Sequence, residues 1–150
     1  MSSSPRRRAR ELALQGLYER QLAGSAAPQV FADLAASGGY KHADQPYFAE
    51  LWEGAAGGYD ALLARVTPFL DRSPASLSPI ERAVMVIGAW ELLHRQEIPY
   101  RVVINEAVEL AKDFGGTDGH KYVNGVLDRL AAEVRAREIA ALARERGAAG

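Results

Sequence analysis

The sequence contains no cysteine. It therefore has no disulfide framework, no thiolate nucleophile and no cysteine-based zinc site, which fits a reducing compartment. It also lacks an uninterrupted apolar run of about 18 residues, the length that a membrane-spanning helix requires. The arginines near the N-terminus are not followed by the apolar segment of a secretory signal, because Glu11, Gln15 and Glu19 interrupt it. We therefore expect a cytoplasmic protein with no membrane segment.

Neither sign of charge is in clear excess. The 150 residues include 18 Lys and Arg and 19 Asp and Glu, for a formal net charge of −1. Any affinity for a polyanion must therefore come from the local placement of charge and not from the total. The hydrophobic content of 48% is ordinary for a folded domain. We expect residues 1–150 to form one domain, or two small halves that share a core.

Apolar residues recur at three- and four-residue steps through most of the chain, which is the spacing of an amphipathic helix. No alternating pattern typical of strands is present. The sequence therefore predicts an all-α fold, a helical bundle of six to seven helices. The expected helices cover residues 6–23, 29–36, 46–70, 78–94, 100–114 and 118–134.

Two breaks organise this pattern. The pair Gly57-Gly58 lies inside the segment 46–70, and we expect it to kink that helix or to permit a close helix crossing. The loop 71–77 separates two sub-halves, about 5–70 and 78–135. The polar C-terminal tail 136–150 is rich in Ala, Arg and Glu and has little apolar surface to bury.

Four arginines, Arg6, Arg7, Arg8 and Arg10, crowd the start of the first helix. A helix N-terminus is already positive through its dipole, so these charges cost stability unless a negative partner balances them. Phosphate is a natural partner, because guanidinium forks match phosphate oxygens. Tyr18 lies on the same helix face as Arg7, and arginine beside an aromatic ring is typical of sites for single-stranded nucleic acid. The alternative is a solvated charged terminus with Tyr18 half-buried.

A second polar cluster lies at the junction of the last two amphipathic helices, in residues 117–124. Several of its side chains must face solvent, where a lysine can contact phosphate, an asparagine can read a base edge and a tyrosine can stack on a base. The alternative is a helix cap by Thr117 or Asp118, with Asn124 bonded to a neighbouring backbone. The cluster comprises Asp118, His120, Lys121, Tyr122 and Asn124.

Glu91 and Glu106 lie beside apolar stripes, where a pair of carboxylates could support acid–base catalysis. Nothing in the sequence defines their separation, and a structural pair with an arginine is the commoner explanation. The three histidines lack metal-ligand spacing, and no glycine-rich phosphate loop follows a strand. We therefore expect no catalytic residues, no metal, no cofactor and no enzymatic activity.

Three stretches carry a resemblance to a known family. RRRARELALQGLYERQ, SPIERAVMVIGAWELL and IPYRVVINEAVELAKDFGGTDGHKYVNGVLDRL resemble the NusB family of transcription antitermination factors, over residues 5–135 and in the same order. The resemblance implies two three-helix halves packed together, without catalytic activity. It also implies binding of single-stranded boxA RNA together with NusE, a small-subunit ribosomal protein. Other Nus factors and RNA polymerase complete an assembly that suppresses premature termination, notably in ribosomal RNA operons.

The resemblance further implies an RNA surface and a NusE side. The NusE side includes Glu81, which completes a capping box with Ser78. Val86 stands where many relatives have arginine, Gly119 replaces a common serine, and Tyr122 replaces a common phenylalanine, so RNA affinity is affected more than RNA specificity. The implied RNA surface comprises Arg6, Arg7, Arg8, Arg10, Tyr18, Asp118, His120, Lys121, Tyr122 and Asn124.

Two other functions stay open at this point. One is a protein-interaction scaffold that binds a NusE-like protein without RNA. The other is an accessory role in RNA modification, since a similar helical domain is fused to RNA methyltransferases, although this chain has no pattern of a methyl-donor site. The sequence also leaves open the preferred RNA sequence and whether the free protein is a monomer or a homodimer.

Overall fold

The computed structural model describes residues 4–116 and 118–149, and every regular element in these two ranges is helical. The all-α prediction is confirmed. The predicted count of six to seven helices is too low, because the two described ranges hold eight α-helices. These are α1 (Pro5–Ala23), α2 (Ala27–Ala35), α3 (Gln45–Gly57), α4 (Tyr59–Val66), α5 (Pro79–His94), α6 (Tyr100–Phe114), α7 (Gly119–Val134) and α8 (Ala136–Ala149), with 3-10 turns at 40–42, 67–69 and 74–76.

Two local features raise the helix count. Gly58 adopts φ −107° and ψ 21° between α3 and α4, so the expected segment 46–70 forms two helices and not one kinked helix. A Cβ atom at Gly58 would lie 3.0 Å from the carbonyl oxygen of Gly54, so the tight turn favours glycine. The tail also forms a helix, α8, because Ile139 and Leu142 find apolar surface to pack against.

Caps define the starts of α1, α3 and α5. The side chains of Ser4, Asp44 and Ser78 each accept a hydrogen bond from the backbone N–H three residues later, and a proline opens each of these helices. The predicted capping box is confirmed. Glu81 N donates to Ser78 Oγ at 3.1 Å, and Ser78 N donates to Glu81 Oε1 at 3.0 Å.

α5 is the central helix of the protein. Its residues 83–92 are buried without interruption, and it packs against α1, α3, α4, α6 and α7. Close approach to α5 depends on small residues: a Cβ atom at Gly54 of α3 would lie 1.9 Å from Trp90 Nε1, and one at Gly88 would lie 2.7 Å from Leu127 of α7. The core is therefore organised around one helix that neighbours touch on all sides.

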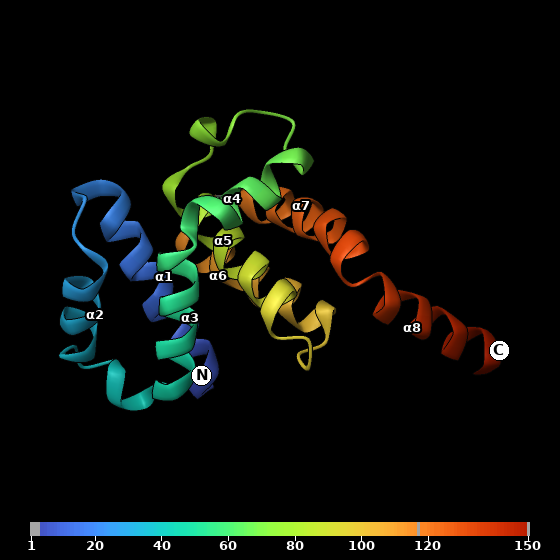
Figure 1. The fold of residues 1–150 in the computed structure, drawn as a ribbon, viewed down its shortest axis with the longest axis horizontal. Coiled ribbons are helices and arrows are strands. Elements are labelled where there is room, and N and C mark those ends of the chain that lie inside the picture. Colours follow the sequence, from blue (N-terminus) through green and yellow to red (C-terminus); the bar gives the residue numbers. More distant parts are fainter. Residues whose placement is uncertain (1–3, 117, 150) are drawn as a thin grey trace.

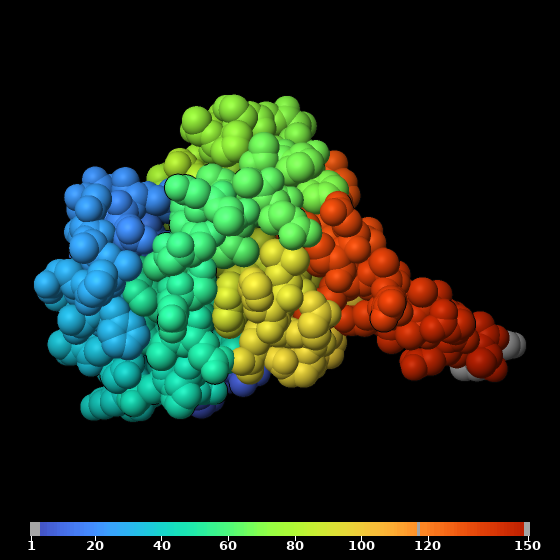
Figure 2. Space-filling model, in the orientation of Figure 1, coloured from blue at the N-terminus to red at the C-terminus, as the bar shows by residue number. Residues whose placement is uncertain are grey.

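The other helices form two groups around α5. In Figure 1, α1, α2 and α3 lie together on one side, α7 lies on the other, and α6, which packs against α5 and α7, runs behind α5. α4 packs mainly against α5. Figure 2 shows α8 as an arm that extends away from the body of the protein. Within the described part of the chain, no helix has the length and apolar character needed to cross a membrane.

Arg135, between α7 and α8, closes the C-terminal end of α5. Its guanidinium is buried and donates to the carbonyl oxygens of Leu92 at 2.8 Å, Ile98 at 3.0 Å and Arg95 at 3.0 Å. The same guanidinium pairs with Glu138 of α8. One side chain thus satisfies carbonyls that a helix end leaves without partners, and ties α8 to the body.

Candidate nucleic-acid and protein interface

The four N-terminal arginines do not form one exposed cluster. Arg10 is 3% exposed, its Nε donates to both carboxylate oxygens of Glu91 at 3.0 Å, and its Nη1 donates to Glu106 at 3.1 Å. Burial by itself would lower the pKa of Arg10, but the charge of Glu91 and the hydrogen bonds to it raise the pKa instead. The expectation that Arg10 faces a polyanion is therefore corrected, because its charge is neutralised inside the protein.

Glu91 forms a buried structural pair with Arg10. Its buried carboxylate also accepts a hydrogen bond from the hydroxyl of Tyr47. Burial, together with the nearby charge of Glu91, raises the pKa of Tyr47 well above its usual value. The ring of Tyr47 carries the guanidinium of Arg6 at 4.2 Å from its centroid. All these groups are engaged with one another, so the network stabilises the packing of α1 on α3 and α5.

The other three arginines keep part of their surface in solvent. Arg7 Nε donates to Glu106 Oε1 at 3.1 Å, while more than a third of the Arg7 side chain stays exposed. Arg6 approaches Asp44 at 3.9 Å. Arg8 is half-buried and lies at the edge of a groove along α1. Arg6, Arg7 and Arg8 are thus the cations that this helix start presents to a partner.

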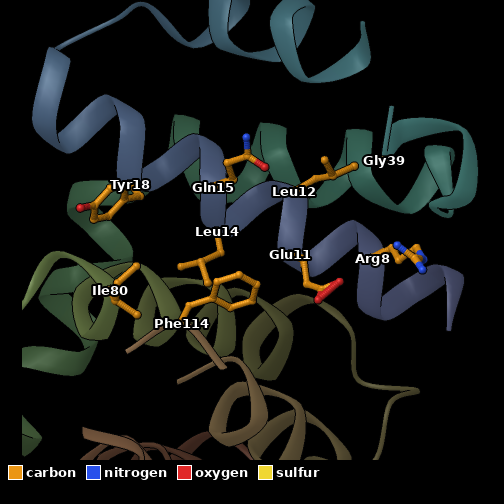
Figure 3. Close-up of a pocket in the computed structure, with 9 residues that line it drawn as sticks. All are labelled: Arg8, Glu11, Leu12, Leu14, Gln15, Tyr18, Gly39, Ile80 and Phe114. Atoms are coloured by element: carbon orange, nitrogen blue, oxygen red, sulfur yellow. The ribbon is translucent and has the colours of Figure 1, made fainter. Parts of the chain in front are cut away.

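A groove of about 500 Å³ runs along α1 (Figure 3). Tyr18 and Phe114 are 38% and 49% exposed, and they lie with Ile80 at one end, whereas Arg8 lies at the other. An apolar groove bordered by a few charges is typical of protein–protein contacts. Tyr18, which the sequence predicts on the RNA surface, lies in this groove with part of its side chain exposed. The lining residues are Arg8, Glu11, Leu12, Leu14, Gln15, Tyr18, Gly39, Ile80 and Phe114.

The polar cluster around the start of α7 is largely exposed. Asp118, Lys121 and Asn124 face solvent, and Lys121 Nζ lies 3.6 Å from Asp118 Oδ1, an exposed pair that contributes little stability. Asp118 occupies the N-cap position without a side-chain capping bond. His120 is half-buried, and its enclosed Nδ1 has no hydrogen-bond partner among the described residues. The alternative cap, Thr117, lies outside the described residues.

Tyr122 differs from its neighbours because it is tied to the loop between α4 and α5. Its hydroxyl donates to Asp71 Oδ1 at 2.8 Å and accepts from the Asp71 N–H at 3.1 Å. The guanidinium of Arg72 lies 4.3 Å from the centroid of the Tyr122 ring. Burial and the hydrogen bond to Asp71 raise the pKa of Tyr122. Asp71 and Arg72 are not predicted from the sequence, since nothing local signals a contact across 51 residues.

Glu81 lies beside this polar cluster and not on a separate side of the molecule. A Cβ atom at Gly119 would lie 2.7 Å from Glu81 Oε2, so the starts of α5 and α7 are in contact. Ile80, the preceding residue, lines the groove. Glu81 therefore marks the junction between groove and cluster. Val86, noted for replacing an arginine, is fully buried and has no access to a ligand.

The arrangement places the two polar sets at opposite ends of the same groove. Arg8 lies at one end, and at the other end Ile80 is followed by Glu81, which contacts the start of α7. Ten residues of α1 separate Arg8 from Tyr18, a rise of about 15 Å. No group of acidic residues and histidines suited to hold a metal ion occurs in the part of the chain that the structure covers. The surface combines exposed cations, an apolar groove and a polar cluster, which suits the binding of an anionic or a protein partner.

Known proteins resemble this chain over almost its whole length. The NusB family model matches residues 7–132. The transcription antitermination protein NusB of Ralstonia nicotianae is 57% identical over 138 residues, which are 92% of this chain and 89% of the relative. T. maritima NusB has a similar structure, with a TM-score of 0.77, 27% identity and coverage of 88% of this chain and 94% of the other. A solved complex of NusB and NusE with double-stranded RNA matches with a TM-score of 0.75 and 25% identity, over 83% and 93% of the two chains.

Proposed function

Because this chain belongs to the NusB family, we propose that it is an antitermination factor that binds single-stranded boxA RNA together with NusE. In this role it joins other Nus factors on RNA polymerase and suppresses premature termination, notably in ribosomal RNA operons. The proposal involves binding only, without a catalytic step. It is supported by the relative from Ralstonia nicotianae, which carries the name of transcription antitermination protein.

The exposed polar cluster at the start of α7 carries the RNA half of the proposal. Lys121 and Asn124 face solvent beside the aromatic ring of Tyr122, a combination suited to a phosphate, a base edge and a base face. The N-terminal arginines extend this surface past the groove, and Tyr18 lies in the groove between the two polar sets. The buried Arg10 is removed from the surface. The proposed RNA surface comprises Arg6, Arg7, Arg8, Tyr18, Asp118, His120, Lys121, Tyr122 and Asn124.

The groove along α1 carries the protein half. Its exposed Tyr18 and Phe114 offer apolar contact area, and Arg8 and Glu11 at its edge offer charged contacts that fix orientation. Glu81, at the junction with the polar cluster, suits a basic ribosomal protein. The solved complex that resembles this chain contains both NusE and RNA, which supports adjacent sites for the two partners.

The test is a titration of labelled boxA RNA with and without purified NusE, at several salt concentrations. We expect RNA affinity to fall with salt, by about 0.7 in the log–log slope for each neutralised phosphate, and to rise when NusE is present. An RNA of the same length and scrambled sequence is the control. If NusE binds but the RNA shows no salt-dependent affinity in either condition, the scaffold function replaces this proposal.

A further inference from the structure

The loop after α4 is attached to α7 by one side chain. Leu70 to Ser73 lie between two 3-10 turns, and the hydroxyl of Tyr122 holds Asp71 through both its backbone N–H and its carboxylate. A phenylalanine at this position would keep the ring and lose both hydrogen bonds. The hydroxyl therefore fixes where the loop, and the residue after Asp71, sit relative to the start of α7.

The residue after Asp71 is Arg72, whose guanidinium covers the ring of Tyr122. Its Nε donates to Asp71 Oδ1 at 2.9 Å, and within the described residues its terminal N–H groups have no acceptor. The two side chains are 46% and 67% exposed, so solvent screens the ion pair and it holds the arginine only weakly. The position of Arg72 is therefore set by the fixed loop and by stacking on the Tyr122 ring, while its terminal N–H groups stay available to a ligand.

The charges around the start of α7 make Arg72 important for an anionic ligand. Asp71, Glu81 and Asp118 place three carboxylates around this helix start, and Lys121 is the cation of the polar cluster. One lysine leaves the neighbourhood repulsive to phosphate. Arg72 adds a second cation, stacked on the ring of Tyr122, and reduces the excess of carboxylates over cations from two to one.

We propose that Arg72 is a further RNA-contacting residue, and that Tyr122 and Asp71 are the residues that position it. This inference rests on the proposed binding of RNA at the start of α7. A guanidinium plane stacked on an aromatic ring presents its outer face to a nucleobase and its N–H edge to phosphate oxygens. On the ring face that the guanidinium covers, RNA would contact Arg72, and Tyr122 would contribute by holding Arg72 in place.

The experiment measures the dissociation constant of boxA RNA against salt for the wild type, Arg72→Ala, Tyr122→Phe and the double variant. We expect Arg72→Ala to weaken binding about tenfold and to flatten the log–log slope by about 0.7. Tyr122→Phe should weaken binding less, and should have no further effect when Arg72 is already alanine. Arg72→Lys should keep the slope and lose affinity, because a lysine keeps the charge without the plane.

Arg144→Ala, which removes an exposed arginine from α8, is the matched control for charge loss. If the wild type itself shows no salt-dependent binding, the proposed RNA function fails. If the wild type binds and Arg72→Ala behaves like Arg144→Ala, the role of Arg72 is overturned while RNA binding stands. If the effects of Arg72→Ala and Tyr122→Phe are additive, the positioning role of Tyr122 is overturned.

Discussion

Arg10 donates from Nε to both carboxylate oxygens of Glu91, and this buried pair joins α1 to α5 across 81 residues of sequence. The charge of Arg10, which the sequence predicts to face an external partner, is thus neutralised within the core. The pair turns the start of α1 so that Arg6, Arg7 and Arg8 keep their exposure while Arg10 does not.

Arg10→Ala should lower the free energy of unfolding by about 3–5 kcal/mol, because Glu91 would remain buried without its partner. Urea unfolding followed by circular dichroism measures this. Arg8→Ala is the control, since it removes a half-buried arginine from the same helix and should cost less than about 1 kcal/mol. Replacing Arg10 by Met and Glu91 by Leu together should restore much of the loss. An Arg10→Ala protein as stable as the wild type would contradict a stabilising role for the pair.

The ion pairs of Glu106 predict a dependence of stability on pH. Burial would raise the pKa of Glu106, but the hydrogen bond from Arg7 and the charge of Arg10 lower it below the ordinary value of 4.5. A lowered carboxyl pKa stabilises the folded state above the ordinary value, and this contribution is lost as the pH falls through the lower value of the folded protein. Glu106→Gln should therefore be less stable than the wild type at pH 7, with a difference that shrinks below pH 4.5.

Unfolding free energies at pH 3 to 8 check this prediction. Glu109→Gln is the control, because the ion pair of Glu109 with Lys112, at 3.7 Å, is solvent-exposed. A gap between wild type and Glu106→Gln that stays constant over this range would show that the charge of Glu106 is not what stabilises the contact.

Gly54→Ala should destabilise the protein by about 1–3 kcal/mol, because a methyl group there overlaps the indole of Trp90 and forces α3 away from α5. Gly57→Ala, in the same helix, meets no atom within 4 Å and should leave stability nearly unchanged. Thermal unfolding of the two variants measures the difference. Equal melting temperatures would mean that the Trp90 side chain can adopt another rotamer without loss of packing.

Phe114→Ser should weaken the binding of NusE by about 1–3 kcal/mol, because it removes an exposed aromatic ring from the proposed contact surface. Leu22→Ser removes a residue that is 62% exposed and lies outside the groove, and should leave NusE binding unchanged. Isothermal titration calorimetry with purified NusE measures the dissociation constants of the two variants. Identical affinities for both variants would move the NusE site away from the groove.

The helices could be predicted because their signals are local. The Ser78–Glu81 capping box and the glycines at 57 and 58 act within a few residues, and the structure has a helix start and a helix break there. The close helix crossing was expected at these glycines, but Gly54 is the residue in contact with Trp90. The partner of a small residue lies on another helix, and one helix alone does not reveal it.

In the candidate site, too, the sequence predicts local features but not contacts between distant segments. Lys121 and Asn124 could be predicted as exposed because they lie off the apolar stripe of their own helix. Arg10 precedes the buried Ala13 and Leu14 by three and four residues, which was a signal for burial, but the carboxylate that makes burial tolerable comes from α5. The contact between Tyr122 and Asp71 depends on the path of a loop, which helical periodicity does not describe.

Arg135 makes the segment after the family match part of the packed body. The region matched by the family model stops at residue 132, three residues before the guanidinium that closes the end of α5. The guanidinium donates to the carbonyl oxygens of Leu92 and Arg95, and Glu138 of α8 accepts from the same guanidinium. The end of the central helix is therefore closed by a residue beyond the matched region, and a change that shortens the protein before residue 135 would leave these carbonyls to water.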